Sequence, residues 1–112
     1  MCIRDRLHAE GIIEAQDELH AGESETSQML AIAPETVHMD RAVDYVPTIA
    51  RPYLSYGSIF RASPSGVWGE PSKASAEKGE KVFERCAELA VEAMNDAFAY
   101  MAAKERFNYS NF

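Results

Sequence analysis

Apolar and polar residues alternate most regularly near the C-terminal end of the chain. Apolar side chains recur there at steps of three and four, as Val82, Cys86, Ala90, Ala93, Ala97 and Met101, flanked by Phe83, Ala87, Val91, Met94 and Phe98. Most charged side chains fall off this stripe, and Ser75 is a good N-cap before it. We predict one helix of roughly 28 residues, about 42 Å long, whose apolar stripe needs a surface to rest on.

A second, shorter helix is predicted after Gly22. Acidic residues occupy its first turn, and apolar positions follow at helical spacing until Pro34, which ends the helix by removing a backbone N–H. Short helical turns are expected over 34–42, with Pro34 at a first position and Asp40 as an N-cap. Residues 7–17 show no clear periodicity.

Residues 43–71 are rich in proline, glycine and aromatic residues and are predicted to be mostly irregular. Within them, residues 56–61 form the one candidate for a short strand. Long loops of this composition in a compact domain are usually functional or pack against a partner.

Composition excludes several classes of function. The chain has 112 residues, with 11 basic and 18 acidic side chains and a net charge of −7. Such an acidic surface repels phosphate backbones and anionic lipid, so neither nucleic acid nor a membrane is an expected partner. No apolar run approaches the roughly 20 residues that cross a bilayer. Two cysteines, Cys2 and Cys86, make no disulfide framework and indicate a reducing, cytoplasmic setting.

The first six residues, MCIRDR, have neither the apolar core of a signal peptide nor any periodicity. Back-translated as ATG TGT ATA AGA GAC AG, they resemble the end of an adapter used to prepare sequencing libraries. We therefore interpret residues 1–6 as a non-native leader, with a genuine N-terminus as the alternative. The native sequence is then expected to start at Leu7.

His20 is the first candidate for chemistry. It precedes the predicted helix start, with five carboxylates nearby: Glu14, Asp17, Glu18, Glu23 and Glu25. A histidine in such a setting can carry protons near neutral pH, with a carboxylate fixing its tautomer. A capping or structural role explains the spacing equally well. His8 and His38 share no metal-binding spacing with His20 and are expected to be surface or loop residues.

Glu25 and Trp68 are the other candidates. A carboxylate in the first helical turn is favoured by the helix dipole, but Glu25 is also placed to orient His20 or to support a metal-bound water. Trp68, between two glycines, could line a substrate mouth or a subunit contact, or anchor its loop against the last helix. Cys86 is expected to be an inert core residue, and Lys73 and Lys78 to be solvated.

Two separated segments resemble the creatininase family. The stretch HAGESETSQMLAIAPETV (residues 20–37) resembles the family pattern in which a histidine, a glycine and an E-T-S triplet precede an apolar helix and P-x-x-V. The stretch SGVWGEPSKASAEKGE (residues 65–80) resembles its G-V-x-G-x-P-x-x-A-S-x-x-K-G-E segment. Two ordered matches are more specific than either alone. They assign residues 7–106 to the C-terminal portion of one creatininase-like domain, with residues 107–112 as a tail.

This resemblance implies a three-layer αβα fold with a parallel sheet, of which this chain holds mostly helix and loop. It also implies a site with two divalent metals (zinc, manganese or iron). The family's metal ligands come from an E-x-H and an Asp in its N-terminal part and from an N-G-H motif in its middle. No N-G-H occurs here, and the one E-x-H, Glu18-Leu19-His20, lies in the segment that resembles the family's C-terminal part. The resemblance makes His20 the acid/base on the scissile amide and Glu25 the carboxylate beside it. Trp68 is the candidate substrate-binding residue because of its place in the glycine-flanked loop.

The function implied is metal-dependent hydrolysis of a C–N amide bond in a small substrate, cyclic or a formamide, by a homo-oligomer. Ala15 and Gln16 stand where creatininase itself carries a tryptophan that closes over creatinine, which argues against creatinine as the substrate. Because the ligand motifs are missing, the fragment alone is expected to be inactive. The alternative is a non-catalytic oligomerisation or binding module derived from the same fold.

Overall fold

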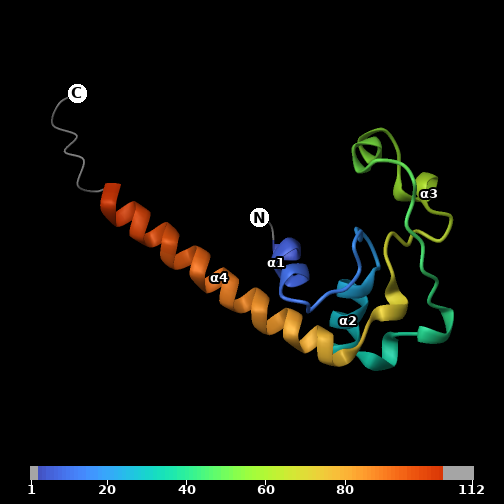
Figure 1. Cartoon of the computed structure of the whole chain (residues 1–112), viewed down its shortest axis with the longest axis horizontal. Helices are drawn as coiled ribbons and strands as arrows, with labels where there is room; N and C mark the ends of the chain where they lie inside the picture. The colour runs from blue at the N-terminus through green and yellow to red at the C-terminus, as the bar shows by residue number, and fades with distance from the viewer. Residues whose placement is uncertain (1–2, 105–112) are drawn as a thin grey trace.

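The computed structural model describes residues 3–104, which fold into helices joined by loops (Figure 1). The α-helices are α1 (Ile3–Ala9), α2 (Glu23–Ile32), α3 (Ile59–Ala62) and α4 (Ala76–Lys104). The 3-10 turns are η1 (Pro34–Thr36), η2 (Met39–Arg41), η3 (Arg51–Tyr56) and η4 (Pro71–Lys73). The expectation of a mostly helical and irregular chain with a long C-terminal helix is therefore confirmed.

Helix α2 ends as the sequence predicts. Ala33 leaves the helical region at φ −150°, and Pro34 opens η1 in the position where its missing N–H costs nothing. The predicted N-cap role of Asp40 is wrong. The Arg41 N–H donates to the carbonyl of His38 at 2.9 Å, so the turn begins earlier and His38 takes the N-cap position.

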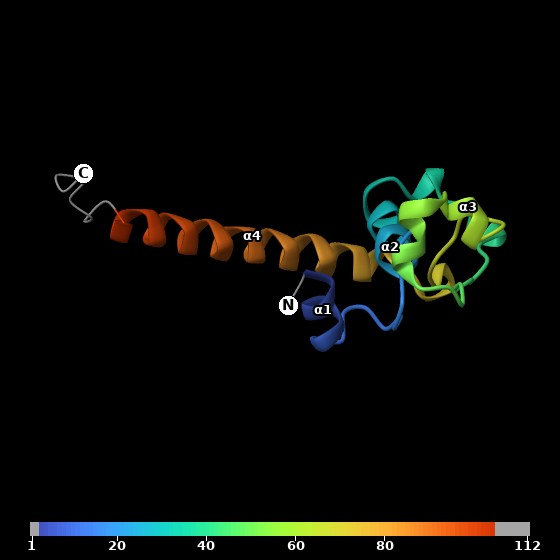
Figure 2. The same cartoon turned by 90° about the horizontal axis from the view of Figure 1, so that it is seen from above.

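Helix α4 begins after Ser75, whose hydroxyl accepts the Lys78 N–H at 3.2 Å, so the predicted N-cap is confirmed. Its first turns pack against α2, and the Ser75 N–H donates to the Ser27 hydroxyl at 3.2 Å. Seen from above, α2 and the loops gather at one end of α4, while α1 lies beside the half of α4 that is nearer to α2 (Figure 2).

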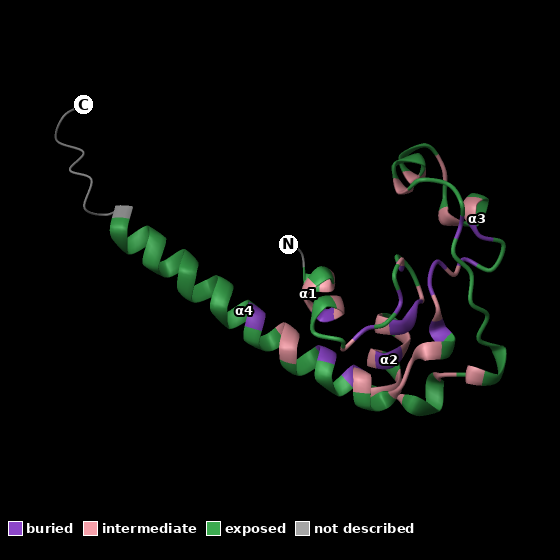
Figure 3. Ribbon diagram, in the orientation of Figure 1, coloured by how far each residue is buried: buried purple, intermediate pink, exposed green. Residues whose placement is uncertain are grey.

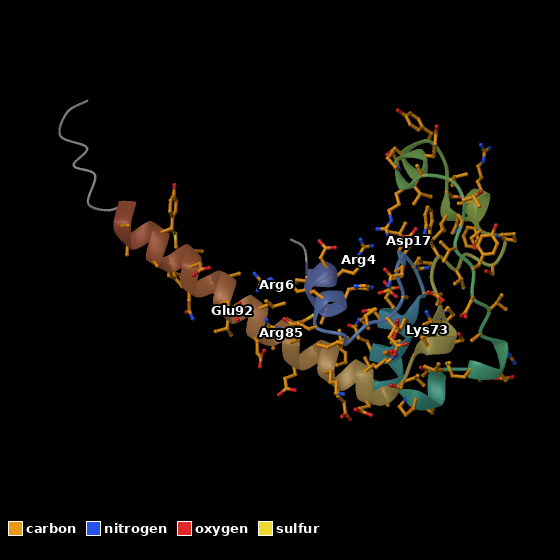
Figure 4. All side chains as sticks on the ribbon, viewed as in Figure 1. Arg4, Arg6, Asp17, Lys73, Arg85 and Glu92 are labelled. Atoms are coloured by element: carbon orange, nitrogen blue, oxygen red, sulfur yellow. The ribbon has the colours of Figure 1, made fainter. Side chains whose placement is uncertain are left out.

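A small core joins the N-terminal segment to α4. Its buried side chains are Leu7, Ile13, Ala15 and Val82, with Ile12 and Cys86 packed against them. Polar contacts reinforce the same junction, since Arg85 pairs with Glu10 at 2.9 Å and Glu92 pairs with Arg6 at 3.6 Å (Figure 4). Residues 3–6 thus belong to α1 in the structure, whereas residues 107–112, the predicted tail, lie outside the described residues.

The C-terminal half of α4 projects away from this core. Every side chain described from residue 90 to residue 103 is exposed (Figure 3). Val91, Met94, Phe98 and Met101 are each at least half exposed. The stripe predicted to need a supporting surface is therefore uncovered over this half of the helix.

The segment 43–71 forms a lobe beyond α2, at the upper right of Figure 1. The strand suggested for residues 56–61 is wrong, because the Arg61 and Ser63 N–H groups donate back to the carbonyls of Ser58 and Ile59. Those local hydrogen bonds form helix α3 instead of the hydrogen bonds between strands that a β-sheet requires. Between residues 3 and 104, β-type pairing is confined to isolated bridges, His20–Trp68 and Tyr45–Gly69.

Candidate functional site

His20 is held by its backbone against Trp68. The N–H groups of Leu19 and His20 donate to the Trp68 carbonyl at 2.8 and 3.2 Å, and the Trp68 N–H donates to the His20 carbonyl at 2.9 Å. The two sequence motifs, far apart along the chain, thus meet at this bridge. The imidazole of His20 remains 57% exposed and is free to meet a ligand.

Glu25 stands on the first turn of α2, beside His20. Its Oε2 atom lies 3.8 Å from Nδ1 of His20 and accepts the Ala21 N–H at 2.5 Å. This contact resembles a capping box, in which a carboxylate on the third helical residue reaches back to the chain before the helix. Ala21 takes the left-handed conformation, φ 50°, that lets the chain turn between the two side chains.

Both side chains border a groove of about 480 Å³. Gly22, Ser24 and Gln28 of the same segment border it too, together with Leu7, Val82 and Cys86 from the core and Arg4 and Arg51 at its polar edge. The volume falls within the range of small-molecule sites. The structure thus places His20 and Glu25 together on one concave surface.

Glu18 is a groove residue that sequence reasoning did not single out from its acidic neighbours. It is only 8% exposed, and its Oε2 accepts the Ser24 N–H at 3.0 Å at the start of α2. Burial raises the pKa of Glu18 above its ordinary value of 4.5, although the bond from Ser24 opposes the rise. The signal in the sequence that could have identified Glu18 is its place six residues before Ser24, whose backbone N–H lies in the first turn of α2 and has no partner within the helix.

The prediction that Lys78 is solvated is wrong. Its side chain is 20% exposed, and its ammonium donates to Glu23 at 2.5 Å and to Glu14 at 2.9 Å. Glu23 is fully buried and also accepts the N–H groups of Glu14 and Ala15 at 2.8 and 2.6 Å. Burial lowers the pKa of Lys78, but the two carboxylates outweigh it and raise the pKa above 10.5. Lys73 pairs with Glu70 at 2.9 Å.

Trp68 is buried, at 1% exposure. Its indole N–H donates to Asp17 at 3.3 Å, and the guanidinium of Arg51 lies 6.0 Å from its ring. The Arg51 guanidinium holds the pKa of Asp17 below its ordinary value of 3.8, against the effect of burial. Binding of substrate by Trp68 stays a prediction.

The part of the chain that the structure describes holds no group of three or more His, Cys, Asp or Glu side chains arranged to bind a metal ion. Nε2 of His8 lies 2.8 Å from the side-chain amide nitrogen of Gln16. His38 borders a second hollow, which shares Glu25 with the groove but does not include His20. Neither histidine joins His20. The donors among residues 3–104 therefore do not form a metal centre by themselves.

The family model described as creatinine amidohydrolase matches residues 3–94. The chain belongs to the creatininase family. This match covers both resembling segments and starts at Ile3; the interpretation of residues 1–6 as a leader stays a prediction.

Relatives within the creatininase family differ in what they act on. The chain is 35% identical over 98 residues to the creatinine amidohydrolase of Pseudomonas putida, covering 83% of this chain and 36% of that protein. It is 40% identical over 72 residues to the mycofactocin precursor peptide peptidase of Mycobacterium ulcerans, covering 62% of this chain and 29% of that protein. The chain thus spans about a third of the length of these relatives.

Solved creatininase structures match the fold over most of this chain. A crystal structure of creatinine amidohydrolase superposes with a TM-score of 0.62 at 34% identity, covering 86% of this chain and 37% of that one. A mutant creatininase of the Zn–Zn type gives 0.58 at 36% identity, covering 70% and 31%. The manganese form gives 0.62 at 34% identity, covering 86% and 37%. No helix within residues 3–104 is both long and apolar enough to span a membrane.

Proposed function

We propose that this chain supplies the acid/base half of an amidohydrolase site. His20 is the proton carrier, and Glu25 orients and balances it. The observation that supports this most is their shared position on one groove, with Nδ1 of His20 3.8 Å from Oε2 of Glu25. Membership of a family of hydrolases supplies the reaction class.

The chemistry needs such a pair because the nitrogen of an amide is a poor leaving group until it is protonated. An imidazolium facing the groove gives its proton to that nitrogen as the C–N bond breaks. A carboxylate beside the ring helps to keep the ring in one orientation. The backbone bridge to Trp68 fixes where the donor stands.

The whole-protein properties belong to the same proposal. They are a three-layer αβα fold, two divalent metals (zinc, manganese or iron), a homo-oligomer, a cytoplasmic location, and a small cyclic or formamide substrate cleaved at its C–N bond. Creatininases of Zn–Zn and manganese type support the choice of metals. The donors among the described residues do not form a metal centre.

A chimera tests this function. Residues 7–104 replace the matching segment of the Pseudomonas putida creatinine amidohydrolase, and the metal-loaded protein is assayed on creatinine and on a panel of small formamides and dipeptides. We expect hydrolysis of at least one substrate, with His20→Ala and Glu25→Ala each lowering kcat by about 100-fold or more. His38→Ala is the matched control and should leave kcat unchanged. A folded, metal-replete chimera that cleaves nothing, or that tolerates His20→Ala, refutes the proposal.

A non-catalytic module is the second candidate. The uncovered apolar stripe on the C-terminal half of α4 favours it, because large exposed apolar surfaces usually mark interaction sites. The chimera separates the two functions, since a module predicts association without hydrolysis.

A further inference from the structure

Arg51, the first residue of η3, reaches out of the 43–71 lobe to the segment that carries His20. Its Nη2 atom donates to the carboxylate of Asp17 and, at 2.7 Å, to the carbonyl of Glu18. One nitrogen thereby joins a side chain and a backbone group within three residues of His20. The Arg51 side chain is 35% exposed and also borders the groove.

Trp68 completes the contact from the opposite side. Its indole N–H holds the second oxygen of Asp17, and the Arg51 guanidinium lies over its ring. Its backbone makes the three hydrogen bonds to Leu19 and His20. Arg51, Asp17 and Trp68 therefore form a closed set of contacts, which we call the Arg51 clamp.

The clamp matters because residues 17–19 lie in neither helix nor strand. No repeating ladder fixes their backbone, so tertiary contacts must do so. The His20 side chain is more than half exposed and lies 3.8 Å from Glu25, a distance too long for a direct hydrogen bond. The position of the His20 ring relative to Glu25 thus depends on where the clamp sets the backbone.

We propose that Arg51 is a positioning residue for His20, acting through Asp17 and Trp68. This inference rests on the proposed function for its catalytic meaning, but the positioning itself is a property of this chain. A lysine cannot replace the guanidinium fully, because the planar group both donates to oxygen atoms and stacks on an aromatic face. Arg4 also donates to the Glu18 carbonyl, at 3.0 Å, and its charge lowers the pKa of Asp17, though less than Arg51 does.

The first test uses the 112-residue chain and its nuclear magnetic resonance spectra. In Arg51→Met we expect amide hydrogen exchange at Leu19 and His20 to accelerate about tenfold or more, with exchange in the first turns of α4 unchanged. The His20 ring signals should shift, with those of His8 and His38 as internal references. Arg51→Lys should restore part of both effects. Arg61→Met, on the same lobe, is the matched control and should change neither.

Unchanged exchange at Leu19 and His20, together with unchanged ring signals, would overturn the proposal. Helical circular dichroism monitors the fold; if Arg51→Met unfolds the chain, Asp17→Asn, which keeps the side-chain shape, must give the same local exchange and ring shifts. An Asp17→Asn chain with neither effect overturns the proposal as well.

The chimera distinguishes this inference from the proposed function. Arg51→Met should lower kcat about tenfold there while changing KM less than twofold, because a misplaced proton carrier slows the chemical step. If exchange at His20 accelerates but kcat does not change, the clamp stands and the catalytic role of His20 fails. If exchange is unchanged, the clamp fails whatever the effect of His20→Ala on hydrolysis.

Discussion

Gly79 of α4 lies directly against the carbonyl of Ser27 in α2. A Cβ atom built on Gly79 would stand 2.0 Å from that oxygen and 2.6 Å from the carbonyl carbon. Both contacts are with backbone, which cannot rotate away as a side chain can. The absence of a side chain at Gly79 therefore sets how closely the two helices pack, and α2 carries Glu25 while α4 carries Lys78.

Gly79→Ala should accordingly destabilise the chain. Alanine gains about 1 kcal/mol of helix propensity over glycine. Parting two packed helices costs about 1–3 kcal/mol, and a backbone contact this close favours the upper end. We expect a net loss of about 1 kcal/mol or more in the free energy of unfolding, measured by urea titration. Glu80→Ala, at an exposed neighbouring position, should change it little; stabilisation by Gly79→Ala would contradict the packing.

The buried pair of Glu23 and Lys78 gives a second prediction. Lys78→Met leaves the Glu23 carboxylate buried without its cation, and should lower the free energy of unfolding by about 3 kcal/mol, the low end for such pairs because Lys78 is still 20% exposed. The double variant Glu23→Gln with Lys78→Met removes both charges and should recover part of the loss. Lys81→Met, whose partner Glu77 is exposed, is the control. Equal losses at Lys78 and Lys81 would contradict the model of a buried pair.

The raised pKa of Glu18 predicts a dependence of stability on pH. A carboxyl whose folded pKa lies above its unfolded value binds its proton more tightly in the folded state. The protonated Glu18 carboxyl therefore adds to the free energy of unfolding. This contribution is fully present below about pH 4.5 and is lost as the pH rises through the raised pKa of the folded state. Glu18→Gln keeps an oxygen for the Ser24 N–H but has no titrating carboxyl. The free energy of unfolding of this variant, taken relative to that of the parent chain, should therefore rise between pH 4 and pH 7.

Urea unfolding at those two pH values measures this gain. The comparison must be between variant and parent at each pH, because Asp17 acts in the opposite direction: its lowered pKa stabilises the fold above its unfolded value and less as the pH falls. A Glu18→Gln difference that does not change with pH would show that burial does not govern this carboxyl.

Local rules predicted the helices and their ends well. Ser75, Pro34 and the apolar stripe define α2 and α4 because capping, the missing proline N–H and helical spacing act within a few residues. The 43–71 segment was harder, since η3 and α3 have only six and four residues and are too short to show a repeating pattern. The strand suggested for residues 56–61 failed because neighbouring carbonyls captured the N–H groups that a strand would share with a partner.

In the candidate site, too, neighbouring residues could be predicted from the sequence and distant ones could not. The sequence placed His20 near Glu25 because both lie within one helical turn of Gly22. It could not place Arg51, Trp68 or Lys78, whose contacts with residues 14–20 span 33 to 64 positions along the chain. An ion pair between distant lysine and glutamate residues leaves no local pattern, so the buried role of Lys78 needed the fold.

The metal content of the isolated chain tests the proposal that this chain supplies the acid/base residues but not the metal ligands of the site. The purified 112-residue chain should bind no stoichiometric zinc, manganese or iron and should hydrolyse no amide, because His20 and Glu25 lack a third donor among the residues described. Elemental analysis after dialysis against each metal measures this. Tight binding of one metal per chain would contradict it, and loss of that metal in His20→Ala would assign His20 a direct ligand role.

The C-terminal half of α4 carries an uncovered apolar stripe. Met94 and Phe98 are 52% and 64% exposed and lie one turn apart, so they offer a continuous apolar surface. The isolated chain should bind the dye ANS, and replacing both residues by glutamate should lower its fluorescence at least twofold without loss of α2 packing. Glu84→Gln with Glu88→Gln, on the polar face, is the control. Because α2, His20 and Glu25 lie at the other end of α4, ring signals of His20 that shift in the glutamate variant would show that the two ends of the helix are not independent.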